Sequence, residues 1–499
     1  MRLGLAAAAG AAIALCFLRF ELWPLAWIAF VPILLAVATA PRTAAAARAG
    51  FIAGIVTNVP AFHWLVHTIH VFGGFPISIA AFFYALLSSA CALQFVLFAI
   101  AVRRSGFGPL AIFPALHWVA LEFLFPNLFP WRLANSQFHV LPLLQIGEVT
   151  GPFGLSFVMV WASAAVVKSR LEGVRSGRMA LAGASLAIAA VVAYGAWRIP
   201  RVDRAIASAP VVRVAIVQGN LSIEEKGDVR YFEGNLATYR ELTRAIVESA
   251  DVVIWPETVI TEPLPRSLTV LPEGARTVLG LERPLLAGAL TYTGAPEDPI
   301  YYNSVLLFDG EGRIRGTSDK QILMPFGEYM PLSGVFPWLA DLSPMTGDFA
   351  AGSEVVVLDV PGAGRFAPLN CYEDLRASIA RDATVRGRAE VLFAVANDAW
   401  FGDTAAPFQH EALALWRAIE ARRFLIRVTN TGVTDVIDPA GRVLVRFPVF
   451  EPHAQVAEVR RLAGTTPYLR FGDTFAWLVV AAAATTLLAS RASTRSEKK

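Results

Sequence analysis

The pattern of apolar and polar positions divides the chain into two parts. Most of the first 200 residues form long apolar runs separated by short polar loops, and one more such run lies near the C-terminus. A helix needs about 20 mostly apolar residues to cross the hydrocarbon core of a membrane. The pattern therefore predicts eight transmembrane helices, at residues 3–18, 22–40, 51–71, 77–102, 108–125, 153–167, 179–197 and 474–490.

The pattern changes at Pro210, where short β-branched runs begin to alternate with stretches of helical period. Helices are predicted at residues 232–249 and 408–422. Strands are predicted at residues 211–218, 251–255, 285–290, 304–308, 365–369, 391–395, 424–429, 433–438 and 443–447. Alternating strands and helices are typical of an α/β layered domain. We therefore predict four parts: residues 1–200 with transmembrane helices 1–7, an α/β domain at 210–465, helix 8 at 474–490 and a basic tail at 491–499.

The distribution of charge supports this division. Of the 40 acidic side chains in the chain, residues 1–197 contain only four, namely Glu21, Glu122, Glu148 and Glu172. This excludes a uniformly soluble chain and a disordered one, because soluble domains carry roughly a quarter of charged residues throughout. The net charge is +3 and no basic stripe is present, so no nucleic-acid partner is expected. Three cysteines are too few for a disulfide framework.

Basic residues in the short loops predict the orientation in the membrane. They are concentrated in every second loop, at Arg2, Arg42, Arg48, Arg103, Arg104, Lys168, Arg170, Arg175, Arg178, Arg491, Arg495, Lys498 and Lys499. The alternate short loops contain only Arg19 and Arg132. Cytoplasmic loops carry the excess of Lys and Arg. With eight helices, both termini are therefore expected in the cytoplasm, with residues 198–473 on the opposite side.

Three histidines, His63, His67 and His70, are spaced to share one face of a helix. A metal site would need a carboxylate or thiolate nearby, and the surrounding sequence offers none. The spacing therefore favours a helix end that faces a wet cavity over a metal site.

The α/β domain contains a single cysteine, Cys371, between a predicted strand and a polar, helix-like stretch. At such a corner the N–H groups of a helix can lower the pKa of a thiol and bind an oxyanion. A catalytic thiol of this kind would react fast with alkylating reagents near neutral pH. A buried structural cysteine is the alternative, and the local sequence by itself favours it.

A thiol nucleophile needs a base, and two residues qualify. His410 begins the predicted helix at 408–422, and histidine is the usual choice. Glu257 ends a buried strand, where partial desolvation raises the pKa of a carboxyl towards that of a working base. Lys320 could stabilise an oxyanion, held by Glu328. Each of these charges could instead be a solvated surface group, which is the usual case.

The order Glu257, Lys320, Cys371, each in its own motif, resembles the nitrilase superfamily. With the flanking apolar runs, the whole chain resembles the apolipoprotein N-acyltransferase family. The motifs are Gln218-Gly219-Asn220, Trp255-Pro256-Glu257, Tyr302-Asn303-Ser304, Pro325-Phe326-Gly327-Glu328-Tyr329, Cys371-Tyr372-Glu373, Asn397-Asp398-Ala399-Trp400-Phe401-Gly402, Pro407, Gln409-His410 and Thr429-Asn430-Thr431-Gly432. Three positions depart from the family pattern: Gly227 follows Lys226 where a tryptophan is common, Asn370 replaces an aliphatic residue, and Ala396 replaces a serine.

The resemblance implies an extracytoplasmic αββα sandwich attached to a polytopic α-helical membrane domain. It implies a catalytic triad of Glu257 as base, Lys320 as oxyanion stabiliser and Cys371 as nucleophile. The expected supporting or substrate-binding residues are Glu328, Tyr372, Glu373 and Trp400. No cofactor and no metal is expected.

The implied reaction is a two-step acyl transfer in the bacterial inner membrane. The donor is a membrane phospholipid, with the sn-1 chain of phosphatidylethanolamine expected, and the acceptor is the free α-amino group of a diacylglyceryl-cysteine on an apolipoprotein. A monomer is expected. Both substrates carry long acyl chains, so a lid is expected at residues 336–349, with Trp338, Leu342, Met345 and Phe349. An ordinary surface loop is the alternative for this stretch.

Two other functions are alternatives for this sequence. A membrane-anchored amidase or nitrilase acting on a small C–N substrate would use the same triad, although eight helices are excessive for an anchor. A transporter or sensor with a non-catalytic outer domain would be expected to show ionisable residues in its spans or paired repeats. The predicted spans contain only Glu122 and the histidines as such residues, and no repeat is evident.

Overall fold

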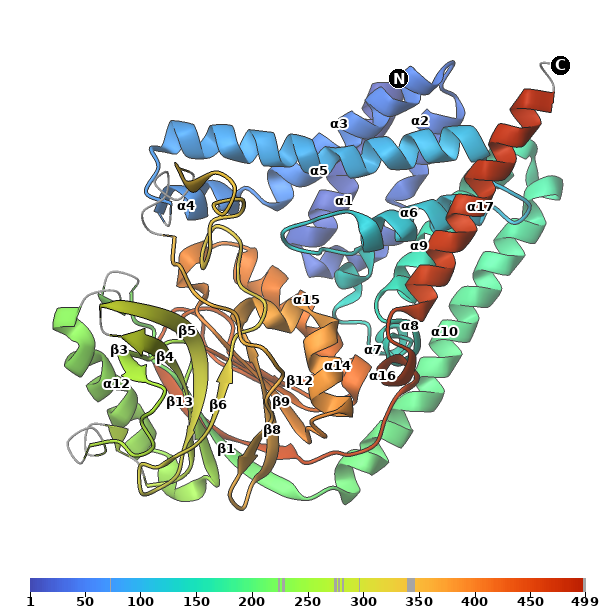
Figure 1. Ribbon diagram of the computed structural model, residues 1–499. Coiled ribbons are helices and arrows are strands. Elements are labelled where there is room, and N and C mark those ends of the chain that lie inside the picture. Colours follow the sequence, from blue (N-terminus) through green and yellow to red (C-terminus); the bar gives the residue numbers. More distant parts are fainter. Residues whose placement is uncertain are drawn as a thin grey trace. The chain divides into compact units, whose positions relative to one another are not determined.

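The computed structural model describes residues 1–71, 73–222, 225–226, 229–272, 276, 279–280, 282–295, 297–338 and 346–496. The chain divides into two compact units. The first, which we call the helical unit, comprises Met1–Val66, Pro76–Pro200 and Phe471–Lys499. The second, which we call the sandwich unit, comprises His67–Phe75 and Arg201–Arg470. Figure 1 labels the elements of both.

The helical unit is built from apolar helices joined by short loops. Its elements are α1 (Arg2–Leu18), η1 (Phe20–Trp27), α2 (Phe30–Ala38), α3 (Thr43–Ala61), α5 (Ile77–Ser105), α6 (Phe113–Leu124), η2 (Leu133–Gln137), α7 (Leu141–Leu144), α8 (Gly147–Thr150), α9 (Phe153–Glu172), α10 (Val174–Ser208) and α17 (Thr474–Ser496). Within the described residues, five segments are long and apolar enough to span a membrane, namely Phe20–Ala38, Thr43–Ala61, Ile77–Ser105, Phe153–Glu172 and Gly177–Ser208. Three shorter apolar helices are Arg2–Leu18, Phe113–Leu124 and Thr474–Ser490. The number of helices that cross the membrane stays a prediction.

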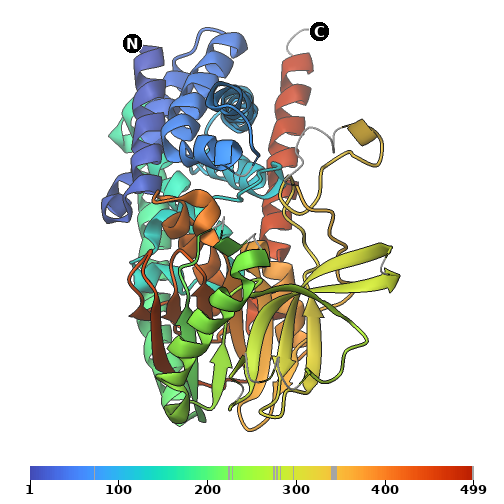
Figure 2. The same ribbon diagram turned by 90° about the vertical axis from the view of Figure 1, so that its left-hand side faces the viewer.

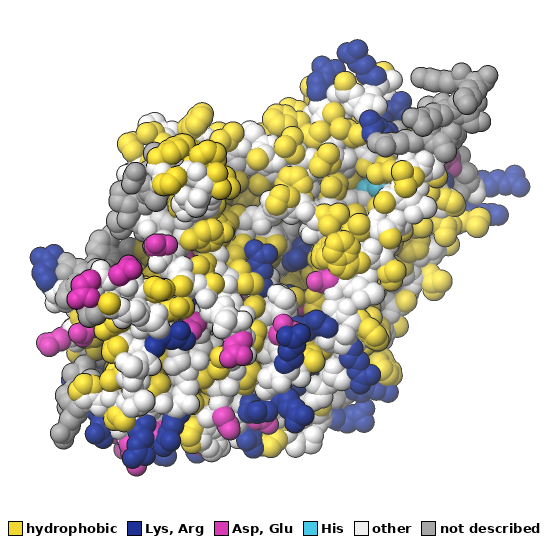
Figure 3. Space-filling view, in the orientation of Figure 1, with side chains coloured by type: hydrophobic (Ala, Val, Ile, Leu, Met, Phe, Trp, Pro, Cys, Tyr) yellow, Lys and Arg dark blue, Asp and Glu magenta, His cyan; other side chains and the backbone are white. Residues whose placement is uncertain are grey.

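The exposed side of these helices is apolar, as expected for a membrane protein. On α5, the side chains of Phe82, Leu86, Leu93 and Leu97 are 65%, 60%, 49% and 47% exposed and recur at helical spacing. Soluble proteins rarely expose so continuous an apolar face, whereas lipid is a suitable neighbour for it. On the face shown in Figure 3, hydrophobic side chains gather over the helices, while acidic side chains gather mainly over the strands.

The predicted span at residues 51–71 is wrong in its position. The long helix there is α3, which begins at Thr43, and a separate short helix, α4 (Trp64–Val71), follows it. Small residues let α3 pack closely against α5, since a Cβ on Gly50 would lie 2.5 Å from the carbonyl oxygen of Phe95. Such small residues are typical of helix contacts in membranes. They contribute little hydropathy, which is why the apolar pattern misplaced the helix.

The three histidines do not share a helical face, because His63 lies between α3 and α4. Its Nδ1 lies 2.9 Å from the carbonyl oxygen of Pro60, and Nδ1 of His70 lies 2.6 Å from that of Phe75. His67 Nε2 lies beside Gly402, 2.8 Å from where a Cβ on that glycine would be. The described residues contain no group of three His, Cys, Asp or Glu side chains placed to hold a metal ion.

The sandwich unit contains two β-sheets. The strands of the first sheet are β1 (Val211–Gln218), β2 (Val252–Ile254), β3 (Ile260–Pro265), β4 (Leu285–Ala295), β5 (Asp298–Phe308), β6 (Ile314–Asp319) and β13 (His453–Arg460). Those of the second are β7 (Leu358–Val360), β8 (Gly364–Asn370), β9 (Val391–Ala396), β10 (Leu425–Thr429), β11 (Asp435–Ile437) and β12 (Val443–Arg446). The helical elements are η3 (Val229–Tyr231), α12 (Phe232–Arg244), η4 (Val247–Ser249), η6 (Cys371–Leu375), α14 (Ala377–Val385), η7 (Asp398–Phe401), α15 (Ala406–Ala421) and α16 (Pro467–Phe471).

Strand direction decides where polar side chains meet. The first sheet has the order β13-β1-β2-β4-β5-β6, with β3 pairing β4, and β1, β2 and β4 are parallel. The second has the order β12-β11-β10-β9-β8-β7, and β8, β9 and β10 are parallel. Parallel strands end at the same edge of a sheet, where open α/β sheets bind their ligands. Glu257 follows β2 and Cys371 follows β8, so both lie beyond such ends.

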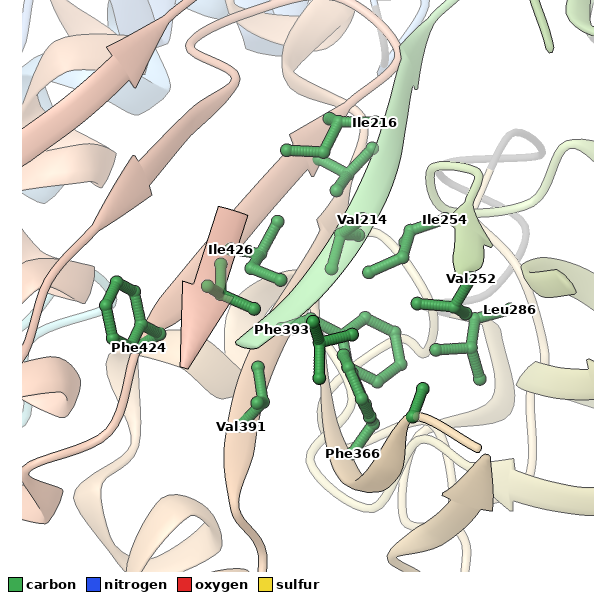
Figure 4. Close-up of a cluster of buried hydrophobic side chains, with 14 of the residues drawn as sticks. Val214, Ile216, Val252, Ile254, Leu286, Phe366, Val391, Phe393, Phe424 and Ile426 are labelled. Atoms are coloured by element: carbon green, nitrogen blue, oxygen red, sulfur yellow. The ribbon is translucent and has the colours of Figure 1, made fainter. Parts of the chain in front are cut away.

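The layers follow from the hydrophobic clusters. One cluster fills the space between the sheets, and its members include Val214, Ile254, Phe366, Phe393 and Ile426 (Figure 4). A second cluster lies on the other face of the first sheet, beneath α12. The helices α14 and α15 pack on the second sheet, against β8 and β10 (Figures 1 and 2). This order of helix, sheet, sheet and helix confirms the predicted αββα sandwich.

Candidate active site

Cys371 lies at the corner between β8 and η6. Its φ of 51° falls in the left-handed region, which side chains other than glycine rarely occupy. Such backbone strain persists only where the surrounding structure holds it, and it concentrates at functional sites. Here the corner is held by a capping box, in which the backbone N–H of Asn370 donates to Glu373 Oε2 at 2.9 Å.

Glu373 connects this corner to the segment after β6. Its Oε1 accepts hydrogen bonds from the backbone N–H groups of Gln321, at 2.7 Å, and Ile322, at 3.2 Å. The carboxylate of Glu373 is buried, and both of its oxygens accept hydrogen bonds from backbone N–H groups. Glu373 therefore holds Cys371 in a fixed position relative to Lys320. Tyr372 is also buried, and its hydroxyl accepts a hydrogen bond from Arg376 at 2.5 Å.

The predicted Glu257, Lys320 and Glu328 form one buried charged group. Lys320 is only 2% exposed. Its Nζ lies 2.8 Å from Glu328 Oε2 and 3.4 Å from Glu257 Oε1. Glu328 Oε2 also accepts from the backbone N–H of Met324 at 2.8 Å. A buried lysine is stable as a cation only when carboxylates of this kind surround it.

Asn303 joins these charges together. From β5, its Nδ2 donates to Glu257 Oε1 and to Glu328 Oε1, both at 2.8 Å. Its Oδ1 accepts from Asn370 Nδ2 at 2.9 Å, and its backbone carbonyl accepts from the N–H of Lys320 at 2.8 Å. One amide therefore holds two carboxylates and the residue before the nucleophile. In the sequence, Asn303 is recognisable only as part of the motif Tyr302-Asn303-Ser304, because asparagine does not itself suggest acid–base chemistry.

The electrostatics differ between the lysine and the thiol. Burial alone would lower the pKa of Lys320, but Glu328 and Glu257 outweigh burial and raise it, so the ammonium stays charged. Burial and then the negative charge of Glu257 raise the pKa of the Cys371 thiol well above its usual value, although Lys320 opposes them. The expected lowering of the thiol pKa by helix N–H groups is therefore wrong, and Cys371 is a protonated thiol at neutral pH.

Lys226 is a second buried cation at the site, and no local signal in the sequence distinguishes it from a surface lysine. Its Nζ donates to the backbone carbonyl of Glu257 at 2.5 Å. Burial lowers the pKa of Lys226 to about 8, and the negative charge of Glu257 opposes part of this effect. The neighbouring Gly227 lies outside the described residues.

His410 is engaged elsewhere. Its Nε2 lies 2.8 Å from Asp374 Oδ1 and its Nδ1 lies 2.9 Å from Asp398 Oδ1. Burial would lower the pKa of His410, but the two aspartates outweigh burial and raise it to about 9. The ring is therefore a cation that donates both N–H groups, which leaves no acceptor for the proton of Cys371. The fully buried guanidinium of Arg427 forms ion pairs with the same two aspartates, Asp374 and Asp398.

Residues of several motifs hold strand ends together beside the site. Asn430 Nδ2 donates to Asn397 Oδ1 at 3.0 Å, and Asn430 Oδ1 accepts from the hydroxyl of Tyr239 at 2.9 Å. The backbone N–H of Asn220 donates to the carbonyl of Asn430 at 2.8 Å. These bonds join the ends of β1, β9 and β10 across the two sheets. Gly219 is required here, because a Cβ would lie 2.5 Å from the ring of Tyr239.

Trp400 lies in η7, where its carbonyl accepts a hydrogen bond from Thr68 Oγ1 at 3.2 Å. Of the predicted lid, Trp338 is 58% exposed, and Phe349 donates its backbone N–H to the carbonyl of Glu328 at 3.0 Å. Leu342 and Met345 lie outside the described residues.

Comparisons with known proteins agree with these observations. Residues 9–165 match the family model of the apolipoprotein N-acyltransferase N-terminal domain, and residues 213–468 match that of the carbon-nitrogen hydrolases. The chain is 34% identical to an apolipoprotein N-acyltransferase from Geobacter metallireducens, over 96% of this chain and 93% of that protein. It is 36% identical to one from Azotobacter vinelandii, over 94% of this chain and 91% of that protein.

Among solved structures, half of the chain is similar to Nit3 of Saccharomyces cerevisiae, described as a member of branch 10 of the nitrilase superfamily. The identity is 17% and the TM-score 0.38, with coverage of 50% of this chain and 90% of that one.

We expect Asn303→Leu to reduce acylation of Cys371 by about 10- to 100-fold, since misplacing catalytic groups by about 1 Å can cost about 100-fold. Asn303→Asp is the matched variant of nearly equal shape. It should reduce acylation further, because an aspartate cannot donate to Glu257 and Glu328 and repels both. Mass spectrometry of the Cys371 peptide measures the rate. Unchanged rates in both variants, with unchanged melting temperatures, would contradict the assigned role.

We expect the stability contributed by protonated His410 to depend on pH. Its pKa is raised from 6.5 to about 9 in the folded state by Asp374 and Asp398. The contribution is therefore complete below about pH 6.5 and is lost as the pH rises through about 9. Thermal unfolding of the wild type and His410→Gln from pH 6 to 10 measures this. The difference in melting temperature should be largest at the acidic end and should shrink above pH 9, whereas a constant difference would exclude a charged histidine.

Proposed function

The chain belongs to the apolipoprotein N-acyltransferase family, and we propose that it transfers a fatty acyl chain from a membrane phospholipid to the N-terminal α-amino group of an S-diacylglyceryl-cysteine through a thioester on Cys371. The observation that carries the proposal is the buried group of Glu257, Lys320 and Glu328, whose charges act directly on the thiol of Cys371. A cysteine next to a carboxylate and an ammonium is suited to acyl transfer.

In the first half-reaction, the sulfur of Cys371 attacks the ester carbonyl carbon of the phospholipid while Glu257 takes the thiol proton. Because the thiol is protonated beforehand, proton removal and attack occur together. Lys320 and the backbone N–H of Tyr372 stabilise the oxyanion. The carbon–oxygen bond of the ester then breaks, and Glu257 gives its proton to the leaving lysophospholipid. Glu328 and Asn303 keep Lys320 and Glu257 in place.

In the second half-reaction, the free α-amino group of the acceptor attacks the thioester carbon, and Glu257 takes a proton from the nitrogen. The carbon–sulfur bond breaks, an amide forms, and Glu257 returns the proton to the sulfur. Two steps through a covalent intermediate give ping-pong kinetics. We propose phosphatidylethanolamine, with its sn-1 chain, as the donor.

The helical unit gives this chemistry access to its substrates. Each CH₂ group moved from lipid to water costs about 0.8 kcal/mol, so lifting a whole acyl chain out of the bilayer would cost more than about 10 kcal/mol. We propose that the chain lies in the bacterial inner membrane as a monomer, with both termini in the cytoplasm and residues 210–465 in the periplasm as the catalytic domain. The parts at 1–200, 474–490 and 491–499 would be helices 1–7, helix 8 and a cytoplasmic tail.

Residues 336–349 remain a proposed lid over the acyl chain. The exposed indole of Trp338 supports this, because a lid must offer apolar surface to a lipid. The hydrogen bond between Phe349 and the carbonyl of Glu328 ties the end of this segment to the charged group at the site. Tyr372 and Trp400 are proposed to line the pocket.

The second candidate is a membrane-anchored amidase of the nitrilase type acting on a small C–N substrate. It would use the same residues, but water would cleave the thioester. The long apolar helices favour a lipid substrate over a small soluble one.

Mass spectrometry of the purified full chain after exposure to phosphatidylethanolamine tests the proposal. We expect a fatty acyl mass on the peptide that contains Cys371, and its loss when a peptide with a free S-diacylglyceryl-cysteine N-terminus is added. An N-acetylated peptide is the matched control and should leave the thioester in place. Failure to form the adduct, or its discharge by water alone at the same rate, would contradict acyl transfer. Cys371→Ala should abolish the adduct, whereas the other two cysteines should carry none.

A further inference from the structure

The main chain at the proposed base is held closely by β4. The N–H of Gly288 donates to the carbonyl of Pro256 at 3.1 Å, and the carbonyl of Gly288 accepts from the N–H of Val259 at 2.9 Å. A Cβ on Gly288 would lie only 2.6 Å from the Cα of Glu257, and Thr258 has a left-handed φ of 49°. The strand therefore bonds to the chain on both sides of Glu257, whereas the carbonyl of Glu257 itself takes its hydrogen bond from a side chain.

That side chain is Lys226. Its Nζ donates to the carbonyl of Glu257 at 2.5 Å, and the residue is only 9% exposed. The lysine is anchored to α12, which Figure 1 labels, because Nδ2 of Asn235 donates to the carbonyl of the preceding Glu225 at 3.0 Å. The backbone N–H of Lys226 also donates to the carbonyl of Ser222 at 3.0 Å. The ammonium therefore reaches the proposed base from a fixed position.

Lys226 differs from Lys320 in lacking a paired carboxylate. Lys320 forms ion pairs with Glu328 and Glu257, whereas Lys226 forms none among the described residues, and burial lowers the pKa of Lys226 to about 8. A buried cation without a paired anion reduces stability, and an apolar side chain of similar size would cost less. Stability therefore does not account for a lysine at this position. Buried ionisable groups with altered pKa values concentrate at functional sites, and this one contacts the proposed base.

The charges around Lys226 belong to the catalytic group. The titratable groups that face it are Glu257, at the end of β2, and Cys371, after β8. The carboxylate of the same Glu257 is held by Lys320 Nζ at 3.4 Å and by Asn303 Nδ2 at 2.8 Å. Glu257 is thus held at two points, its carboxylate by Lys320 and Asn303 and its main chain by Lys226. Such placement matters for a base, because a shift of about 1 Å can cost about 100-fold in rate.

We propose that the ammonium of Lys226 is a positioning group: by holding the main-chain carbonyl of Glu257, it keeps the carboxylate of that residue within reach of the Cys371 sulfur. This role rests on the proposed function, in which Glu257 moves a proton in both half-reactions. Lys226 itself exchanges no proton. Its loss should therefore slow both half-reactions by a similar factor, whereas loss of a residue that binds one substrate would slow mainly one of them.

Lys226→Met in the full chain tests this role, because methionine has a similar length and cannot donate. Mass spectrometry of the Cys371 peptide measures thioester formation from phosphatidylethanolamine, and then discharge of the loaded thioester by a peptide with a free S-diacylglyceryl-cysteine N-terminus. We expect each rate to fall by about 10- to 100-fold. The melting temperature should be unchanged or higher, because no cation is buried. Glu225→Gln, at the exposed neighbouring position, is the matched control and should leave both rates unchanged.

A double variant separates positioning from other roles. Glu257→Gln should form the thioester at the same rate, within about twofold, with and without Lys226→Met, because Lys226 then has no base to position. Losses that multiply would mean that Lys226 acts on the substrate or on the fold, and would overturn the proposal. If Glu257→Gln is too slow to follow, the pH dependence decides.

The pH dependence tests the charge. With its pKa lowered to about 8, Lys226 is an ammonium below that pH and an amine above it, and a charged donor forms a hydrogen bond about twice as strong as a neutral one. The ratio of the wild-type rate to the Lys226→Met rate should therefore be largest near pH 6.5 and should shrink severalfold by pH 9.5. A constant ratio, or unchanged rates in Lys226→Met, would overturn the proposal. Absence of a thioester in the wild type would instead contradict the proposed function.

Discussion

The ion pair between Lys320 and Glu328, with Glu257 beside it, is the interaction on which the site depends. A lysine this deeply buried is tolerated only because two carboxylates face it, and two carboxylates this close are tolerated only because the lysine and Asn303 lie between them. The members come from the ends of β2 and β6, from β5 and from the loop at Glu328, and Asn303 extends the contact to Asn370 in the second sheet. Both sheets must therefore assemble before the charges are satisfied, which makes the fold and the site inseparable.

This arrangement explains the use of an uncharged nucleophile. Burial and the charge of Glu257 raise the pKa of Cys371, so the sulfur is not a free thiolate that reacts with any electrophile. It becomes nucleophilic when Glu257 removes its proton during attack on a carbonyl that Lys320 and the Tyr372 N–H can polarise. Reactivity then depends on a correctly bound ester or thioester. This dependence limits reaction of the free thiol with unrelated electrophiles.

The sequence predicted those parts of the molecule that rest on local pattern or on a motif. The αββα sandwich was predicted correctly because buried strands such as β1, β9 and β10 are short runs made mostly of apolar residues. Strands β3, β6, β7 and β13 were missed. Strands β6 and β13 contain many polar residues, β3 contains two prolines, and β7 has only three residues. Asn303 and Lys226 could not be identified as members of the site, because their importance comes from neighbours that are distant in sequence. The choice between His410 and Glu257 also required coordinates, since only the structure shows both ring nitrogens of His410 directed at aspartates.

The most direct test of the account compares two reactions of Cys371 in Glu257→Gln. Removing the negative charge of Glu257 lowers the pKa of the thiol, so alkylation of Cys371 by iodoacetamide at pH 8, followed on its own peptide, should become faster than in the wild type. Removing the base should at the same time slow thioester formation from phospholipid by about 100-fold or more. Opposite changes are the predicted result. A parallel loss of both reactions would mean that Glu257 maintains a pre-formed thiolate, and unchanged thioester formation would mean that another group is the base.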